Sequence, residues 1–246
     1  MDLDFLLAGT RPVNLRHVNW PEKMKCLVTA PHPDDFDAIG VTLKWLMDRG
    51  HEIHAVVAET GSGIDQVYGA GLSPEARRQL RVAEQTDSFR FFTLPEKNYR
   101  FLRLDNAEDD QVAENEANVR FLEELVGELK PDVLFMPHGN DTNRAHRAMY
   151  CMMKTVACRA GWPVALMLNS DAKTRAMRKD GYMAFGEKDA AWKGQLLRCH
   201  VSQHQRNLRE RGHGFDERVL ALNHKTAVEL GLEEPWAESF EIELCR

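Results

Sequence analysis

The sequence contains no apolar run that approaches the roughly 20 residues needed to cross a bilayer. Its start, MDLDFLLAGT, has Asp2 and Asp4 where a signal peptide carries basic residues, and the apolar stretch that follows is too short for one. No Pro/Gly/Ser-rich linker, internal repeat or low-complexity segment divides the 246 residues. We therefore expect a cytoplasmic protein without a membrane span that folds as one domain over residues 1–246.

The sequence also lacks a cysteine motif and a net positive charge. The five cysteines are odd in number and scattered, and no two of them have the C-x-x-C spacing of a metal or redox motif. We interpret them as reduced core thiols of a cytoplasmic protein. The formal net charge is −6 and the pI is about 5.9. A chain of this charge gains little from counterion release on a phosphate backbone, so we do not expect nucleic acid as a partner.

Short β-rich segments alternate with longer helical patterns over the first 170 residues. The patterns predict strands at residues 25–30, 52–58, 100–104, 132–137 and 164–168, and helices at 38–49, 73–89, 107–130 and 141–159. Beyond residue 170 they predict strands at 181–185 and 238–244 and helices at 188–205 and 216–230. This alternation favours an α/β fold, with a Rossmann-like, mostly parallel sheet flanked by helices and a smaller C-terminal α+β extension in the same domain.

The densest group of functional side chains directly follows the first predicted strand, as Pro-His-Pro-Asp-Asp at positions 31–35. The carboxyl ends of parallel strands face the binding crevice of such a sheet, so His32, Asp34 and Asp35 would lie where ligands bind. The two prolines stiffen the loop and keep His32 out of helical geometry. The alternative interpretation is that Asp34 or Asp35 caps the helix that follows.

A second polar cluster follows the predicted strand at 132–137 and opens a helix. It reads PHGNDTNRAHR at positions 137–147 and should lie at the same edge of the sheet. Two such clusters can share one ion. Two histidines and one aspartate, with a fourth position left for water, are typical of a catalytic rather than a structural zinc site. A carboxylate beside the ligands could then act as general base.

The two clusters resemble the motifs of the LmbE-like, or PIG-L, family of zinc-dependent deacetylases. This family includes the de-N-acetylases of GlcNAc-phosphatidylinositol, mycothiol and bacillithiol synthesis. Three further likenesses follow in the family's order and extend over most of the chain: Arg81-x-x-Glu84, then Lys193 with Leu197-x-x-His200-x-Ser202-Gln203, then Glu238-x-Phe240. Each likeness is weak alone, but all five in the right order are specific.

The resemblance implies a role for each matching residue. His32, Asp35 and His146 would be the metal ligands, and Asp34 would be the general base that activates the attacking water. The implied cofactor is Zn²⁺, although two nitrogens and one carboxylate do not exclude another divalent metal. The implied substrate is a small N-acetylated molecule, an amino sugar or its conjugate, from which acetate is released.

The sequence departs from the commonest family pattern at Asn143, where many members have a histidine. That histidine is thought to help stabilise the transition state. Asparagine can donate a hydrogen bond but cannot transfer a proton, so Asn143 is a candidate catalytic residue without an acid role. His200 or His138 would then supply the proton to the leaving amine, or Asp34 would act as both the general base and the general acid.

Several polar residues are candidates for substrate binding. Arg81 would bind the substrate or form an i,i+3 ion pair with Glu84, and His138 or His200 would line the pocket. The basic stretches at 173–179 and 206–211 could attract an anionic substrate group, but a solvated face is the preferred interpretation.

Two alternatives to an N-acetyl sugar hydrolase stay open at the level of sequence. The first keeps the metal site but changes the substrate to another small amide, such as a thiol conjugate. The second is a non-catalytic α/β ligand-binding module in which the acidic pairs are helix caps. The sequence does not distinguish a monomer from a homo-oligomer.

Overall fold

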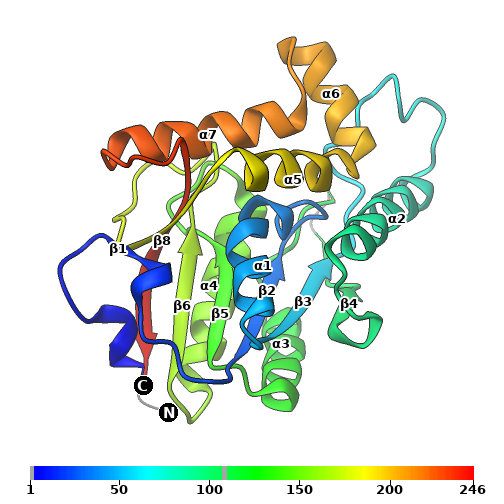
Figure 1. Cartoon of the computed structure of the whole chain (residues 1–246). Coiled ribbons are helices and arrows are strands. Elements are labelled where there is room, and N and C mark those ends of the chain that lie inside the picture. The colour runs from blue at the N-terminus through cyan, green and yellow to red at the C-terminus, as the bar shows by residue number, and fades with distance from the viewer. Residues whose placement is uncertain (1–2, 107–109) are drawn as a thin grey trace.

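The computed structural model describes residues 3–106 and 110–246, and these form an eight-stranded sheet flanked by helices (Figure 1). The strands lie in the order β1-β7-β8-β6-β5-β2-β3-β4. Their bounds are β1 Val13–Asn14, β2 Lys25–Ala30, β3 Glu52–Ala58, β4 Tyr99–Leu102, β5 Val133–Pro137, β6 Val164–Asn169, β7 Gly181–Phe185 and β8 Trp236–Cys245. Strands β2 to β6 run parallel, and β8 runs antiparallel to β6 and β7. The predicted mostly parallel α/β sheet is confirmed.

Helices cover both faces of the sheet. Their bounds are α1 Gly40–Asp48, α2 Pro74–Phe92, α3 Glu116–Leu129, α4 Arg144–Arg159, α5 Glu187–Arg198, α6 Val201–Arg211 and α7 Phe215–Glu229. One apolar core joins the sheet to α1, α2 and α5, and the other joins it to α3 and α4. Val28 points into the first core and Leu27 into the second, as the two-residue period of a strand requires. In the part of the chain that is described, no helix combines the length and apolarity needed to cross a membrane.

Two predicted helices differ from the observed ones. The helix expected at 107–130 begins only at Glu116, because the side chain of Asn115 caps it by accepting a hydrogen bond from the Asn118 amide. Residues 107–109 lie outside the described part of the chain. The helix expected at 188–205 is two helices, α5 and α6, which are separated at Cys199 and His200. The C-terminal segment, expected as an extension, continues the main sheet through β7 and β8.

A buried ion pair fixes α1 to the C-terminal strand. Helix α1 has no capping side chain at its own N-terminus; instead the Glu238 carboxylate on β8 accepts from the backbone amides of Val41 at 3.1 Å and Thr42 at 2.8 Å. Lys193 on α5 donates to Glu238 at 2.7 Å and to the Ala38 carbonyl at 2.6 Å. Because Lys193 is fully buried and Glu238 nearly so, this pair holds the segment after β2 against two distant elements, α5 and β8.

Two of the five cysteines form a disulfide. Cys158, near the end of α4, is bonded to Cys245 at the end of β8, so the expectation that all cysteines are reduced thiols is wrong for this pair. They meet because α4 packs against β8, although 87 positions separate them in sequence. Cys26 is buried and free, as expected, whereas the free Cys151 is exposed.

Candidate active site

A cavity of about 590 Å³ opens at the carboxyl end of the sheet, beside the ends of β2 and β5. Strand β2 pairs with β3 on one side and with β5 on the other. The connections that follow β2 and β5 therefore cross to opposite halves of the sheet. This reversal is the point at which open α/β sheets bind ligands. The loops after both strands line the cavity, and the two sequence clusters therefore do meet at one edge.

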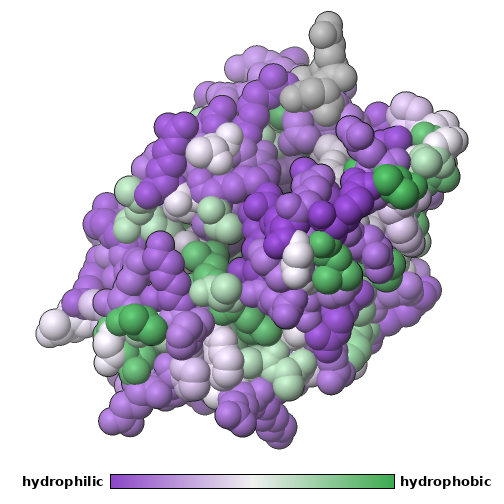
Figure 2. All heavy atoms as spheres, turned by 90° about the horizontal axis from the view of Figure 1, so that it is seen from above, coloured by the Kyte–Doolittle hydropathy of each residue, from purple (hydrophilic) through white to green (hydrophobic). Residues whose placement is uncertain are grey.

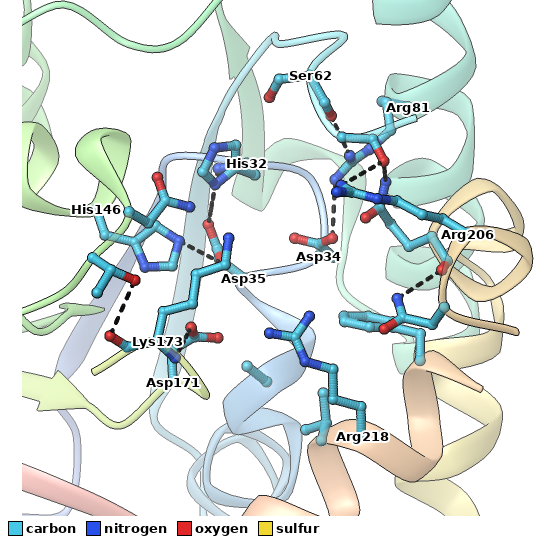
Figure 3. A pocket seen from close by; sticks show the side chains of 18 of the residues that line it. His32, Asp34, Asp35, Ser62, Arg81, His146, Asp171, Lys173, Arg206 and Arg218 are labelled. Carbon is cyan, nitrogen blue, oxygen red and sulfur yellow. Dashed lines mark hydrogen bonds and ion pairs between the residues drawn. The ribbon is translucent and has the colours of Figure 1, made fainter. Parts of the chain in front are cut away.

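The three predicted metal ligands lie together on the cavity wall (Figure 3). The His32 Nδ1 atom lies 3.2 Å from one carboxylate oxygen of Asp35, and His146 Nε2 lies 3.4 Å from the other. One donor atom from each of the three side chains lies within 4.8 Å of the other two. Two imidazole nitrogens and one carboxylate oxygen, open to a cavity on one side, fit a divalent ion with a free coordination position.

The surroundings of these ligands favour positive charge. Burial alone would raise the pKa of Asp35, but the charge of His146 and hydrogen bonds from His146 and His32 hold it well below its ordinary range. Burial would likewise lower the pKa of His146, yet Asp35 and Asp141 raise it to about 10. Surroundings that stabilise a proton on a buried imidazole also favour a bound metal cation. The donor atoms of His32, Asp35 and His146 fit such an ion.

Asp141 orients His146. One Asp141 oxygen lies 3.3 Å from His146 Nδ1, which leaves Nε2 directed toward Asp35. The other oxygen accepts from the Asn143 amide at 2.6 Å, and Thr174 contacts the first oxygen at 3.3 Å. A carboxylate behind a ligating histidine fixes its tautomer and ring orientation. Sequence reasoning missed this role, although Asp141 lies five residues before His146 in the same motif.

The predicted general base, Asp34, is held in an unusual backbone conformation beside the ligands. Its φ angle is 114°, which is uncommon for a residue with a side chain. The Arg81 guanidinium donates to the Asp34 carboxylate at 3.0 Å, to the Pro33 carbonyl, and to the Ser62 carbonyl at 2.7 Å. Gln85 accepts from the Asp34 amide at 2.9 Å. These contacts stabilise a strained loop that presents Asp34 to the cavity.

The local electrostatics of Asp34 suit a proton acceptor. Burial raises the pKa of Asp34, while the charge of Arg81 acts in the opposite direction. The alternative that Asp34 or Asp35 caps a helix is wrong. Neither aspartate caps the short 3₁₀ helix Asp37–Ile39 or α1, which follow: the Asp35 carboxylate accepts from the His32 amide, and the first amides of α1 donate to Glu238.

Arg81 and Glu84 do not form the i,i+3 ion pair that their spacing allows. The Arg81 side chain is about 2% exposed and bonds to the Asp34 loop, whereas Glu84 accepts from the Ser202 amide at 2.6 Å and from its hydroxyl at 2.7 Å. The arginine of the R-x-x-E motif thus supports the Asp34 loop, and the glutamate binds the start of α6. Direct substrate binding by Arg81 stays a prediction.

The structure does not bring His200 or His138 to the cavity wall. His200 is fully buried, and its Nε2 lies 2.5 Å from Asp37, while its Nδ1 has no hydrogen-bond partner among residues 3–106 and 110–246. His138 lies between Glu241, at 3.2 Å from Nε2, and the Asn140 amide, which donates to Nδ1 at 2.9 Å. Neither side chain is among those that line the cavity. Sequence pattern alone could not separate these histidines from His146.

Asn143 does line the cavity, at the start of α4. Its side-chain oxygen accepts from the Ala145 amide at 3.0 Å and caps the helix. Gln111 is a further wall residue that sequence reasoning missed, with its side-chain oxygen 3.0 Å from His32 Nε2. It comes from the loop before α3, which the sequence pattern predicted as part of the helix. Lys173, Arg206 and Arg218 also line this cavity, from segments far apart in the chain (Figure 3).

Comparisons with solved structures find the same fold in several proteins. The N,N'-diacetylchitobiose deacetylase from Pyrococcus horikoshii is 17% identical, with a TM-score of 0.74 over 89% of this chain and 84% of that one. The A40926 pseudoaglycone deacetylase Dbv21 is 16% identical, with a TM-score of 0.67 over 91% and 98%. GalB, the 4-carboxy-2-hydroxymuconate hydratase from Pseudomonas putida KT2440, is 13% identical, with a TM-score of 0.66 over 89% and 95%. Since a hydratase shares this fold with deacetylases, the fold alone does not select the reaction.

The family assignment comes from the sequence itself. No match was found among curated proteins. The family model described as GlcNAc-PI de-N-acetylase, PIG-L, matches residues 27–157, which is more than half of the chain and includes both polar clusters. This assignment sets aside the alternative of a non-catalytic binding module. The chain belongs to the PIG-L family of de-N-acetylases, a family of hydrolytic enzymes.

Proposed function

We propose that this enzyme hydrolyses the N-acetyl group of an amino sugar or its conjugate, with a zinc ion held by His32, Asp35 and His146. The observation that carries the proposal is that these three donors and the Asp34 carboxylate line the same cavity, at the switch point of the sheet. A zinc ion bound there would polarise the acetamide carbonyl and lower the pKa of water.

Asp34 is the proton carrier in this proposal. Its carboxylate is presented to the cavity by Arg81 and takes a proton from the attacking water. His138 and His200 lie away from the cavity wall, so neither is placed to protonate the leaving amine. Asp34 therefore also returns its proton to the amine nitrogen, and burial, which raises its pKa, makes that return easier.

Asn143 has the role of a hydrogen-bond donor to the acetamide carbonyl oxygen. Its side-chain oxygen is occupied by the Ala145 amide, which leaves its NH₂ group as the donor available to substrate. We expect Asn143→Asp to lower kcat by about 10²–10³-fold, as loss of one such donor does elsewhere. Aspartate caps a helix as well as asparagine, so the melting temperature should change little. A kcat within a few-fold of wild type would exclude the donor role.

Asp141 should tune metal affinity through His146. Replacing Asp141 by alanine removes the carboxylate 3.3 Å from His146 Nδ1, and we expect zinc affinity to fall about 10–100-fold. Competition with a chromogenic chelator measures this change. The control is Asp87→Ala, which removes a surface carboxylate on α2 and should leave zinc affinity unchanged. Equal affinities of the Asp141 variant and the wild type would contradict the assignment.

The substrate claim is tested by measuring acetate release from a panel of N-acetylated sugars, their conjugates and simple N-acetyl amides. We expect stoichiometric acetate and free amine from at least one acetylated sugar. If only an amide without a sugar, such as a thiol conjugate, is cleaved, the enzyme class stands but the sugar assignment is wrong. If no acetate is released from any member by zinc-loaded protein, the proposed reaction is wrong.

A further inference from the structure

Three cationic side chains that line the cavity have no ion-pair partner among the described residues. They are Arg218 on α7, Lys173 in the segment after β6, and Arg211 at the end of α6. The three other arginines of the same wall differ: Arg81 is paired with Asp34, Arg206 is paired with Glu210, and Arg144 also has an interaction partner. Figure 3 shows the Arg218 and Lys173 side chains extending into the same cavity as the metal ligands.

Of these three cations, Arg218 is the one whose position is least consistent with that of a solvated surface residue. Its side chain is half-buried, and the neighbouring wall residues Phe215 and Val219 come from the same helix. A guanidinium that is partly removed from water without a counterion is unfavourable, and a bound anion would compensate that cost. Figure 2 views this end of the molecule from above Figure 1, and hydrophilic side chains predominate there.

The unpaired cations and the metal ligands of the cavity come from different segments of the chain. Asp34 and Asp35 belong to the loop after β2, where the acetamide would react, whereas the unpaired cations come from α6, α7 and the segment after β6. Fixed charges of one sign on the wall of a cleft raise the local concentration of ligands of the opposite sign. Because this chain has a net charge of −6, its overall composition does not account for a group of unpaired cations in the cavity.

We infer that the substrate carries an acidic group, a carboxylate or a phosphate, on the part of the molecule away from the acetamide, and that Arg218 and Lys173 bind this group. The inference rests on the proposed function for the reacting end of the cavity. Arg218 supplies two parallel N–H donors, a geometry that matches the oxygens of either anion, and Lys173 supplies a single positive charge. The basic residue Lys173 thus has a binding role rather than the solvated role that its sequence context favoured.

The kinetic test compares a neutral substrate with two acidic ones. The probes are N-acetylglucosamine, N-acetylglucosamine 6-phosphate and N-acetylmuramic acid, which carries a carboxylate. For the wild type we expect kcat/KM to be about 10–100-fold higher for at least one acidic probe than for the neutral sugar. Arg218→Met should reduce that ratio toward one, and Arg218→Lys should retain part of it. The two acidic probes distinguish phosphate from carboxylate recognition.

The matched control is Lys225→Met, which removes one positive charge from the same helix. Lys225 pairs with Glu229 on the surface and does not line the cavity, so the ratio should stay at the wild-type value. A wild-type ratio near one for both acidic probes would overturn the inference. So would an Arg218→Met ratio equal to that of the wild type.

A binding measurement separates this inference from the proposed reaction. Calorimetry on zinc-loaded Asp34→Asn protein should show tighter binding of an acidic probe than of N-acetylglucosamine, with the preference lost when Arg218→Met is added. If this preference is present but no acetate is ever released by the wild type, the anion site stands and the proposed reaction fails. If acetate is released but no acidic probe binds better, the reaction stands and the anion site fails.

Discussion

Replacing Asp34 with asparagine is expected to lower kcat for acetate release by about 10²–10⁴-fold, the range that loss of a general base produces. Asparagine has nearly the same shape, tolerates positive φ values, and can still accept the hydrogen bond from Arg81. The variant should therefore fold normally and bind zinc as the wild type does. Steady-state kinetics on zinc-loaded protein, with zinc content measured on the same sample, checks both expectations.

The control for this substitution is Asp87→Asn, which makes the same chemical change at an exposed position on α2. It should leave kcat and zinc content unchanged. If Asp34→Asn retains kcat within a few-fold of the wild type, Asp34 is not the general base. If the variant loses zinc instead, Asp34 acts as a ligand, and the division between base and ligands within the cluster is wrong.

Replacing Lys193 with methionine is expected to lower the free energy of unfolding by about 3–5 kcal/mol, the usual cost of leaving a buried charge without its partner. Glu238 would remain about 2% exposed beside the start of α1 with no cation to balance it. Burial lowers the pKa of Lys193, and the charges of Glu238 and Asp37 oppose this effect, so the ammonium depends on neighbouring carboxylates. Urea unfolding at fixed zinc concentration measures the loss.

Two further variants show whether the unpaired charge is the cause. Adding Glu238→Gln to Lys193→Met should restore part of the stability, because glutamine still accepts from an α1 amide but carries no charge. Lys44→Met breaks an exposed i,i+4 pair with Asp48 and should cost less than about 1 kcal/mol. Wild-type stability of the Lys193 variant would show that the pair does not hold α1 to the sheet.

The sheet could be predicted because its strands are continuous apolar segments with clear boundaries. Strands β2, β3 and β7 begin and end within the predicted ranges, and α1 ends before Gly50, which has a φ angle of 89°. The late start of α3 could not be predicted, because residues before Glu116 have helical composition but Asn115 supplies the stronger cap. The break between α5 and α6 depends on a tertiary contact, since His200 turns inward to meet Asp37.

The candidate ligands could be found because loops after parallel strands converge, so two sequence clusters predict one site. What the sequence could not show is which polar side chains face the cavity. His200 and His138 appear in motif positions comparable to that of His146. In the structure, however, His200 contacts Asp37 and His138 contacts Glu241, and neither faces the cavity. Conversely, Arg218 is in no motif and reaches the cavity because α7 lies over this end of the sheet.

The metal content of purified protein, measured beside that of His146→Ala, tests the central claim most directly. The account predicts about one zinc ion per wild-type chain, acetate release that depends on this ion, and loss of both in the variant, since His146 Nε2 is one of only three protein donors in the proposed site. Acetate release that persists in rigorously metal-free wild-type protein, or full zinc occupancy in His146→Ala, would contradict it.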